Sequence, residues 1–330
     1  MAADVQPAPP AAPGVSFFSR VRPFTGVIAL VVLCAVFGSR EPAFFSSDNF
    51  LNILSVVSVV GILAVGQAFP LIGGGFDLSQ GAIAGFTGAV VASLMSRYGF
   101  PIPAAIAGGL ALGALLGCIN GVLVAWVGIN PFVATLGTQT AFTGLTLVYT
   151  NNQPQALGAQ AATFRLINYG MIGPFKTASV LFLALIVLLA FVLKMLAYGQ
   201  HLYTLGGNEE ATRLAGIDTV RLKISTYVVS GTLAALASLV MIARAGQASP
   251  SEGRGTELES LASCIIGGIA LGGGVGGAWN VLLGAITLGV ITNGLQMLGK
   301  HGVSPYLQPV IRGVIILLAV AVDARARSRR

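Results

Sequence analysis

The sequence predicts an all-α integral membrane protein. Of its 330 residues, 55% are hydrophobic and only 9% are charged, and the mean hydropathy is +0.85. A soluble domain of this length needs far more polar surface. Runs such as VLFLALIVLLAFVL (180–193) are apolar on every side, whereas transmembrane strands alternate apolar and polar residues. Helices are the remaining spanning element, because in lipid each backbone group must be paired internally.

Both ends of the chain are predicted to lie outside the membrane domain. Residues 1–19, rich in Ala and Pro, are expected to form a disordered cytoplasmic tail. The membrane domain covers 20–323, and 324–330 form a basic cytoplasmic tail. Arg20 and Arg22 precede an apolar run, as in a signal sequence, but no convincing small-residue cleavage site follows. An uncleaved first span is therefore expected.

The membrane domain is predicted to contain about ten transmembrane helices, because a helix needs about 17–25 apolar residues to span a bilayer. The expected spans lie near 24–40, 54–72, 79–95, 101–127, 131–150, 177–197, 222–243, 258–275, 278–298 and 305–322. The third and the eighth are short and interrupted by glycine.

The distribution of positive charge predicts the orientation. Cytoplasmic segments of membrane proteins carry an excess of Lys and Arg. Placing both termini in the cytoplasm puts the opening arginines and the C-terminal cluster inside: Arg20, Arg22, Arg325, Arg327, Arg329 and Arg330. The charged loop 202–223 follows six predicted spans, so it also faces the cytoplasm.

Two hairpins of similar sequence suggest an inverted internal repeat. They are NGVLVAWVGINPFVATLG (120–137) and NGLQMLGKHGVSPYLQPVIRG (293–313), and in each a Pro followed by an aromatic residue comes after an opening Asn-Gly. They fall on spans four and five and on spans nine and ten, and an offset of five spans reverses the direction through the membrane. Inverted repeats are common in transporters with a central pathway. Chance similarity between two Gly-rich apolar hairpins is the alternative.

The sequence offers no basis for covalent catalysis. The histidines His201 and His301 lie in separate predicted loops without partners at metal-ligand spacing. The string GGGVGG (272–277) follows no predicted strand, which argues against a dinucleotide site, and no G-x-x-x-x-G-K-[ST] sequence occurs. We therefore expect that the chain is not an enzyme and that any ATP hydrolysis occurs on a partner.

The charged loop LYTLGGNEEATRLAGIDTVRLK (202–223) predicts a short helix outside the membrane. Asn208 can cap its start, Glu209 and Glu210 favour the positive end of the helix dipole, and Gly216 can terminate it. Ala211, Leu214 and Ala215 fall on one face beside Arg213. Because so short a helix is unstable alone, we expect it to dock in a groove of another protein. A solvated connector is the alternative.

The stretch YGQHLYTLGGNEEATRLAGI (198–217) resembles the cytoplasmic coupling segment of permeases in ribose-type bacterial ABC sugar importers. Three further blocks agree in the same order: GGGFDLSQG (73–81), NGVLVAWVGINPFVATLG (120–137) and GRGTELESLASCIIGGIALGGGVGG (253–277). The chain departs from the family pattern modestly. Gln200 stands where Arg is usual, Phe76 where Ile is common, and Cys264 where Val is common.

The resemblance implies a permease subunit that moves a monosaccharide (a pentose, a hexose or a related polyol) across the bacterial inner membrane. The implied partners are a cytoplasmic ABC ATPase, a periplasmic sugar-binding protein and a second permease copy, with no nucleic acid. It implies no cofactor on this chain, with ATP and Mg on the ATPase. The segment 198–221 would couple to the ATPase through Gly207, Asn208, Glu209, Glu210, Ala211, Arg213, Leu214 and Gly216.

Two further groups of polar residues are candidate sites. Asp77, set in GGGFDLS between apolar runs, either lines the translocation path or lies in a cytoplasmic loop and caps the third span with Ser79. Ser79 is a path candidate together with Asp77. The other path candidates are Asn120, Asn293 and Gln296, for which hydrogen bonding between helices is an equal alternative.

The stretch GQASPSEGRGTELE (246–259), expected outside, is a candidate docking surface for the binding protein. Its candidate contacts are Glu252, Arg254 and Glu257, because complementary charges speed transient encounters. The alternative is a solvated loop whose Glu257 and Glu259 begin the next helix.

The competing function is an ion-coupled secondary transporter of a small polar solute. Such a transporter needs ionisable residues inside several spans. Only Asp77, Glu259, Arg312 and Asp323 lie near membrane depth here, and most are at predicted span ends.

Overall fold

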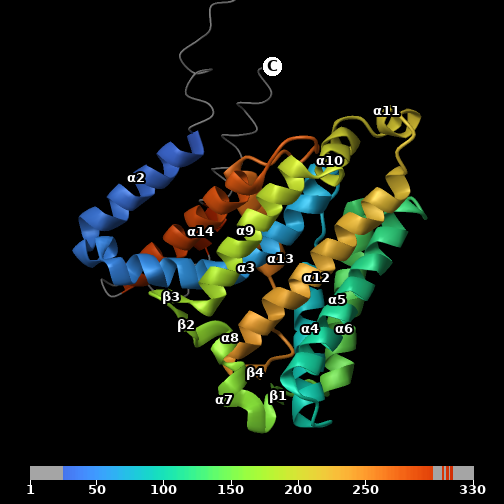
Figure 1. Ribbon diagram of the computed structural model, residues 1–330. Helices are drawn as coiled ribbons and strands as arrows, with labels where there is room; N and C mark the ends of the chain where they lie inside the picture. Colours follow the sequence, from blue (N-terminus) through green and yellow to red (C-terminus); the bar gives the residue numbers. More distant parts are fainter. Residues whose placement is uncertain (1–24, 300–306, 308–309, 312, 315–330) are drawn as a thin grey trace, which may run out of the picture.

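The computed structural model of the 330-residue chain describes residues 25–299, 307, 310–311 and 313–314. The two predicted tails and most of the predicted tenth span, 305–322, lie outside the described residues. Within them the protein is mostly helical (Figure 1).

Nine described helices correspond to the first nine predicted spans. They are α2 (Thr25–Arg40), α3 (Ser47–Ile72), α4 (Gln80–Ser96), α5 (Ile102–Ala125), α6 (Pro131–Thr150), α9 (Thr177–Met195), α12 (Thr219–Ala245), α13 (Thr256–Gly267) and α14 (Ala278–Gly299). Five of them, α3, α5, α9, α12 and α14, are long and apolar enough to cross a membrane. The helices α2 and α4 are apolar but shorter.

Short elements connect these helices. The helical ones are η2 (Pro42–Phe45), η3 (Gly158–Gln160), α7 (Ala161–Phe164), α8 (Leu166–Tyr169), α10 (Ala197–Gly207) and α11 (Glu209–Leu214). The strands are β1 (Gln155–Ala156), β2 (Met171–Ile172), β3 (Phe175–Lys176) and β4 (Gln247–Ala248). Strand β1 pairs with β4, and β2 with β3.

The predicted eighth span, 258–275, is wrong as a continuous helix. Helix α13 has 12 residues and ends at Gly267, so it is about 18 Å long and too short to cross a bilayer. Gly268, with φ +102°, adopts a left-handed conformation that terminates the helix. An irregular segment then continues to α14.

Helix α12 is the central element of the bundle. It packs against α5, α3 and α4, and α3 in turn packs against α12, α14 and α13 (Figure 1). The contact between α12 and α5 depends on glycine. A Cβ at Gly113 or Gly117 would overlap the backbone of α12 at Gly231 and Tyr227, so these backbones touch directly.

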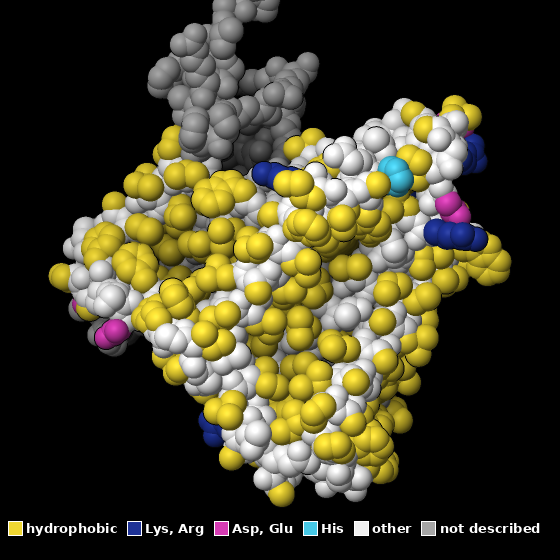
Figure 2. Space-filling view, in the orientation of Figure 1, with side chains coloured by type: hydrophobic (Ala, Val, Ile, Leu, Met, Phe, Trp, Pro, Cys, Tyr) yellow, Lys and Arg dark blue, Asp and Glu magenta, His cyan; other side chains and the backbone are white. Residues whose placement is uncertain are grey.

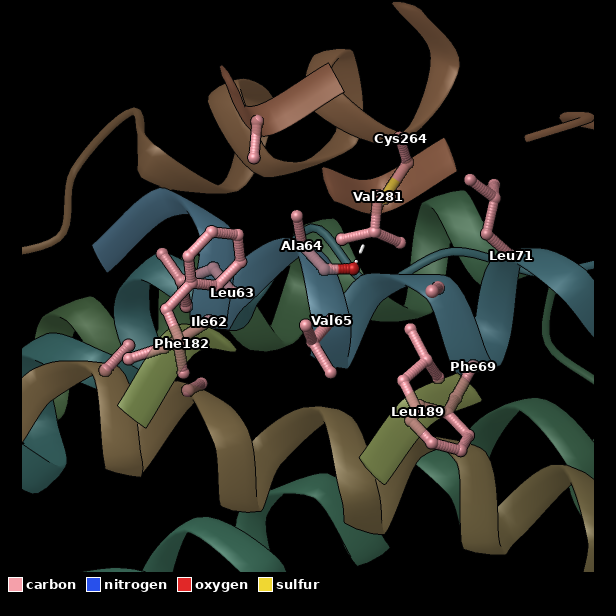
Figure 3. Packing of buried hydrophobic residues seen from close by; sticks show 14 of the residues in the cluster. Ile62, Leu63, Ala64, Val65, Phe69, Leu71, Phe182, Leu189, Cys264 and Val281 are labelled. Atoms are coloured by element: carbon pink, nitrogen blue, oxygen red, sulfur yellow. Dashed lines mark hydrogen bonds between the residues drawn. The ribbon is translucent and has the colours of Figure 1, made fainter. Parts of the chain in front are cut away.

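The largest apolar core surrounds the middle of α3. Figure 3 shows Phe182 and Leu189 of α9 on one side of α3 and Cys264 of α13 with Val281 of α14 on the other. The thiol of Cys264 donates to the backbone oxygen of Ala64 at 3.3 Å. Helix α3 is therefore enclosed on two sides, and its residues from Gly61 to Ile72 are all buried.

The two ends of the bundle differ. The α11 end carries α10, α11 and the start of α12, whereas the opposite end, called here the β1–β4 end, carries the short strands, α7 and α8 (Figure 1). Helix α12 connects the two ends. With 27 residues it is about 40 Å long, which is enough to cross a bilayer.

Candidate functional site

The starts of α4 and α13 meet in the interior of the bundle. Ser260 Oγ of α13 donates to Gln80 Oε1 of α4 at 2.8 Å, and both residues are fully buried. Gly81 lies against the backbone of Gly253 and the carboxylate of Glu257, so a Cβ at this position would overlap both. The segment between α12 and α13 therefore re-enters the bundle before α13 begins.

Asp77 lies beside this junction and is fully buried. Its Oδ1 accepts hydrogen bonds from the backbone nitrogen of Ser79 at 2.9 Å and from Ser79 Oγ at 2.6 Å. Its Oδ2 accepts from Ser230 Oγ of α12 at 2.7 Å. The carboxylate therefore fixes the segment preceding α4 onto α12.

The neighbouring amides extend this network. Asn120 of α5 donates to Ser79 Oγ at 2.6 Å, and Gln80 donates to Ser230 Oγ at 2.9 Å. The Gln67 amide of α3, oriented with its nitrogen toward the Asp77 carbonyl, donates there at 3.1 Å and accepts from the Asp77 nitrogen at 3.2 Å. The network joins α3, α4, α5 and α12 and, through Gln80 and Ser260, α13. Asp77, Ser79 and Asn120 are not among the residues that line the polar cavity described below.

Glu257, a predicted docking residue, is only 5% exposed. Its Oε1 accepts from Gln139 of α6 at 2.8 Å and from the backbone nitrogen of Gly255 at 3.2 Å. The Glu257 side chain points into the bundle because the segment before α13 turns inward, and its role in docking stays a prediction. Glu252 is half-buried, and Arg254 is exposed.

A polar cavity of about 560 Å³ opens in the half of the bundle nearer the β1–β4 end. Helices α3, α12, α13 and α14 enclose it, with Tyr169 of α8. Its polar lining consists of Tyr169, Arg244, Glu252, Glu259, Thr292 and Gln296. Of the two path candidates on α14, only Gln296 lines this cavity. Asn293 is buried and donates to Asn49 Oδ1 at 2.9 Å.

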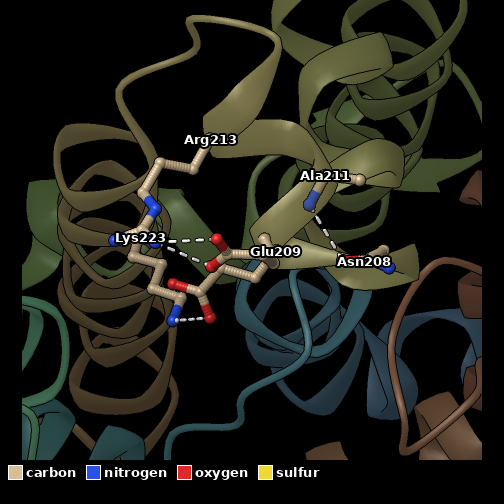
Figure 4. Close-up of polar contacts among 6 residues, drawn as sticks. Asn208, Glu209, Ala211, Arg213 and Lys223 are labelled. Carbon is tan, nitrogen blue, oxygen red and sulfur yellow. Dashed lines mark hydrogen bonds and ion pairs between the residues drawn. The ribbon is translucent and has the colours of Figure 1, made fainter.

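Helix α11 has the predicted cap. Asn208 Oδ1 accepts from the backbone nitrogen of Ala211 at 2.9 Å, and Gly216 follows the helix with φ +82° (Figure 4). Arg213 contacts Glu210 at 2.8 Å, and both the hydrogen bonds and the charge of Glu210 raise the pKa of Arg213. The helix therefore begins and ends where its sequence predicts.

A second ion pair fixes α11 to the start of α12. Lys223 Nζ lies 2.6 Å from Glu209 Oε2 (Figure 4). Leu214, on the face predicted to be apolar, is 78% exposed. In Figure 2 several charged side chains lie near this end, and hydrophobic side chains cover much of the rest of the visible face. Leu214 is thus an exposed apolar side chain close to the charged pair of Glu210 and Arg213.

The connection of α11 to the interior through α10 was not predicted from the sequence. Gly206 lies so close to the Ile72 carbonyl and the Gly274 nitrogen that a Cβ would overlap both. Gly274 donates to the Ile72 oxygen at 2.8 Å, and Tyr203 Oη donates to the Gly276 oxygen at 2.7 Å. Helix α10 therefore contacts the end of α3 and the irregular segment before α14, and its Leu202 side chain lies against Gly73, the first residue of the segment before α4. Repeated glycines in α10 and in both irregular segments were the sequence feature that could have predicted these close contacts.

Comparison with known proteins finds permeases of similar sequence. A family model described as the permease component of the branched-chain amino acid transport system matches residues 49–320. The chain is 40% identical over 301 residues to the ribose import permease protein of Escherichia coli (strain K12), covering 90% of this chain and 92% of that protein. It is 38% identical over 299 residues to the D-allose transport system permease protein of the same strain, covering 89% of each. It is 35% identical over 303 residues to the fructose import permease protein of Rhizobium meliloti, covering 90% of this chain and 82% of that protein.

Proposed function

Because this chain belongs to the family of the branched-chain amino acid transport system permease component, we propose that it is the transmembrane permease of an ABC importer for a monosaccharide. The observation that carries the proposal is the 40% identity to a ribose import permease over 90% of the chain. Relatives named for D-allose and fructose support the wider class of pentoses and hexoses. Permeases of this family are not themselves enzymes.

We propose that ATP and Mg are bound by a separate ATPase subunit that docks on α11. The capped helix presents Leu214, which is 78% exposed, beside the pair of Glu210 and Arg213. An apolar anchor flanked by charges suits insertion into a groove of a partner. Closure of two ATPases on ATP would then displace α11 in each of two permease copies. A sugar-binding protein would deliver the substrate to the opposite end.

The proposed location is the bacterial inner membrane, with both termini in the cytoplasm. The five long apolar helices support a membrane protein, and an ATPase that docks on α11 requires the α11 end to be cytoplasmic. The β1–β4 end then faces the periplasm, where a binding protein can reach it.

We also propose that the fold contains an inverted repeat, in which α3, α4 and α5 correspond to α12, α13 and α14. Pairwise packing supports this correspondence. Helix α12 packs against α4 and α5, as α3 packs against α13 and α14. The second and third helices of each set also pack together, α4 with α5 and α13 with α14. In an inverted repeat the two halves are related by a pseudo-two-fold axis. The contact between the starts of α4 and α13 agrees with an axis that passes through this junction.

The translocation path is proposed to pass Gln296 and Arg254, whereas Asp77, Ser79, Asn120 and Asn293 position helices through buried hydrogen bonds. Gly253 contacts Gly81, which lies about 22 Å along α4 from Ser96 at the β1–β4 end. Arg254 is exposed next to this contact. A charge at such depth faces water or protein, because exposure to lipid is costly. Arg254 is therefore assigned to the path and not to a docking surface for the binding protein.

Uptake measurements test the proposed function. The permease is co-expressed with its ATPase and binding protein in cells that lack their own sugar importers, and uptake of labelled D-ribose, D-allose and D-fructose is followed. We expect uptake of at least one sugar, lost when the ATPase carries an inactive nucleotide site. Uptake that persists without the ATPase would instead support a secondary transporter.

A further inference from the structure

The polar cavity near the β1–β4 end has the size and depth of a ligand site. Its volume of about 560 Å³ lies within the range of about 300–1,000 Å³ that is usual for small-molecule pockets. Glu252 marks its depth. The backbone oxygen of Glu252 lies against Gly85, where a Cβ would approach it to 2.6 Å. Gly85 is about 16 Å along α4 from Ser96.

The lining combines two kinds of surface. One wall is the apolar side of α3 with Val56, Val57, Val59 and Val60, joined by Leu288 of α14. The other walls carry a guanidinium at Arg244, carboxylates at Glu252 and Glu259, a phenol at Tyr169, and the hydroxyl and amide of Thr292 and Gln296. Tyr169 is held at the cavity by its hydrogen bond to the Arg244 backbone oxygen at 3.3 Å.

A monosaccharide matches this combination. Its hydroxyl groups both donate and accept hydrogen bonds, so carboxylates, a guanidinium and an amide can each pair with them. Its C–H surfaces can rest on the valine wall. Charges of both signs, from Arg244 and from Glu252 and Glu259, lie on the same cavity, so its lining offers both donors and acceptors to the hydroxyl groups of a neutral ligand.

We propose that this cavity is a sugar-binding site on the permease itself, occupied by the monosaccharide after it leaves the binding protein. The proposal rests on the proposed function, and it adds a site on this chain with Arg244, Glu252, Thr292 and Gln296 as its hydrogen-bonding residues. Binding there is weak, because a site on a conduction path must release its ligand.

Protection of an introduced thiol tests the site. Ala245→Cys, at an exposed lining position that is not one of the proposed hydrogen-bonding residues, is placed in the full importer complex in nanodiscs without ATP. Its reaction with a charged, membrane-impermeant methanethiosulfonate is timed with and without a transported sugar. Sugar at about ten times its dissociation constant should slow the reaction about tenfold, since the free fraction of the site falls by that factor. Val56→Cys, which replaces a half-buried residue on the same cavity, is a second position in case Ala245→Cys does not fold.

Two controls accompany the test. Thr287→Cys lies on α14, one of the helices that line the cavity, but is 3% exposed and outside the cavity, so its reaction should be slow and insensitive to sugar. The parent chain, which retains Cys34, Cys118 and Cys264, gives the background.

The outcomes separate the two proposals. Normal uptake by the unmodified variants together with labelling that no transported sugar slows would overturn the site and leave the importer function intact. Failure of the parent complex to take up any of the sugars would overturn the importer function, and the site with it.

Discussion

Ser260 Oγ on α13 donates a hydrogen bond to Gln80 Oε1 on α4 at 2.8 Å, although the two residues are 180 positions apart. Ser260 Oγ also donates to the Glu257 backbone oxygen at 2.9 Å, and Gln80 reaches Ser230 of α12 at 2.9 Å. One buried amide thus connects the starts of two short helices to the central helix. The position of α13 is consequently set by polar contacts as well as by apolar packing.

Ser260→Ala should lower the stability of the folded permease by about 1 kcal/mol, the size typical of a hydrogen bond between membrane helices. The Gln80 oxygen loses its donor and stays buried. The measurement is the midpoint temperature of thermal unfolding in detergent, with size-exclusion chromatography used to detect the protein that stays folded. Ser251→Ala, at an exposed position, is the control and should leave the midpoint unchanged. Equal midpoints for the two variants would contradict the role assigned to Ser260.

Gly81→Ala should strongly reduce the yield of folded protein. The added methyl group would overlap the Gly253 backbone and the Glu257 carboxylate, and neither can withdraw without moving α13. Gly137→Ala on α6 is the matched control, because no atom lies within 4 Å of the methyl group it would add. The two variants are compared by the amount of monodisperse protein that is purified from membranes. A normal yield of Gly81→Ala would show that the junction is looser than described.

Glu210→Lys should uncouple ATP hydrolysis from uptake while the protein still inserts and assembles. The reversal places two cations together on α11 and breaks the exposed pair with Arg213, which contributes little to folding. Uptake and ATPase activity are measured in the same proteoliposomes. Asp48→Lys, an equivalent reversal at an exposed site on α3, should behave as the parent. Normal uptake by Glu210→Lys would remove α11 from the ATPase interface.

Cysteines at two exposed alanines should report the orientation of the chain. Ala159→Cys in η3 should react with an impermeant thiol reagent added to intact spheroplasts. Ala215→Cys, directly after α11, should react only after lysis. The reverse pattern would place the α11 end in the periplasm and overturn the proposed topology.

Arg254→Ala should reduce uptake to a similar extent at low and high salt if the side chain lines the path. A docking role predicts something different. The loss would then appear in stimulation of the ATPase by the loaded binding protein, and it would shrink as salt screens the attraction. Sugar uptake and the stimulation of ATPase activity by the loaded binding protein are both measured from low to high ionic strength. A salt-dependent loss of stimulation would return Arg254 to the docking surface.

Much of the fold could be predicted because spanning helices need long apolar runs. Helices α5, α6 and α14 lie within two residues of the expected spans at each end. Helix α3 starts seven residues earlier than expected, at Ser47, because Ser46 caps it and Asp48 occupies its first turn. Helix α13 was mispredicted because hydropathy does not reveal the left-handed Gly268, after which the chain stays apolar but is no longer helical.

The candidate site was only partly predictable. The cap at Asn208 depends on neighbouring residues, so the sequence was sufficient to identify it. The environment of Asp77 depends on Ser230, which lies 153 positions away. No local pattern distinguishes a carboxylate that faces water from one satisfied by distant hydroxyl groups. The burial of Glu257 has the same cause, because its partner Gln139 lies on another helix.

The contact of Gly206 with Ile72 and Gly274 has a mechanical consequence. Backbone atoms touch there directly, so at Gly206 no rotatable side chain lies between α10 and the end of α3 or the segment that leads into α14. Side chains can absorb a displacement by changing rotamer, whereas a contact between backbones has low compliance. A displacement of α10 would therefore be passed at this point to the end of α3 and to the segment before α14 together.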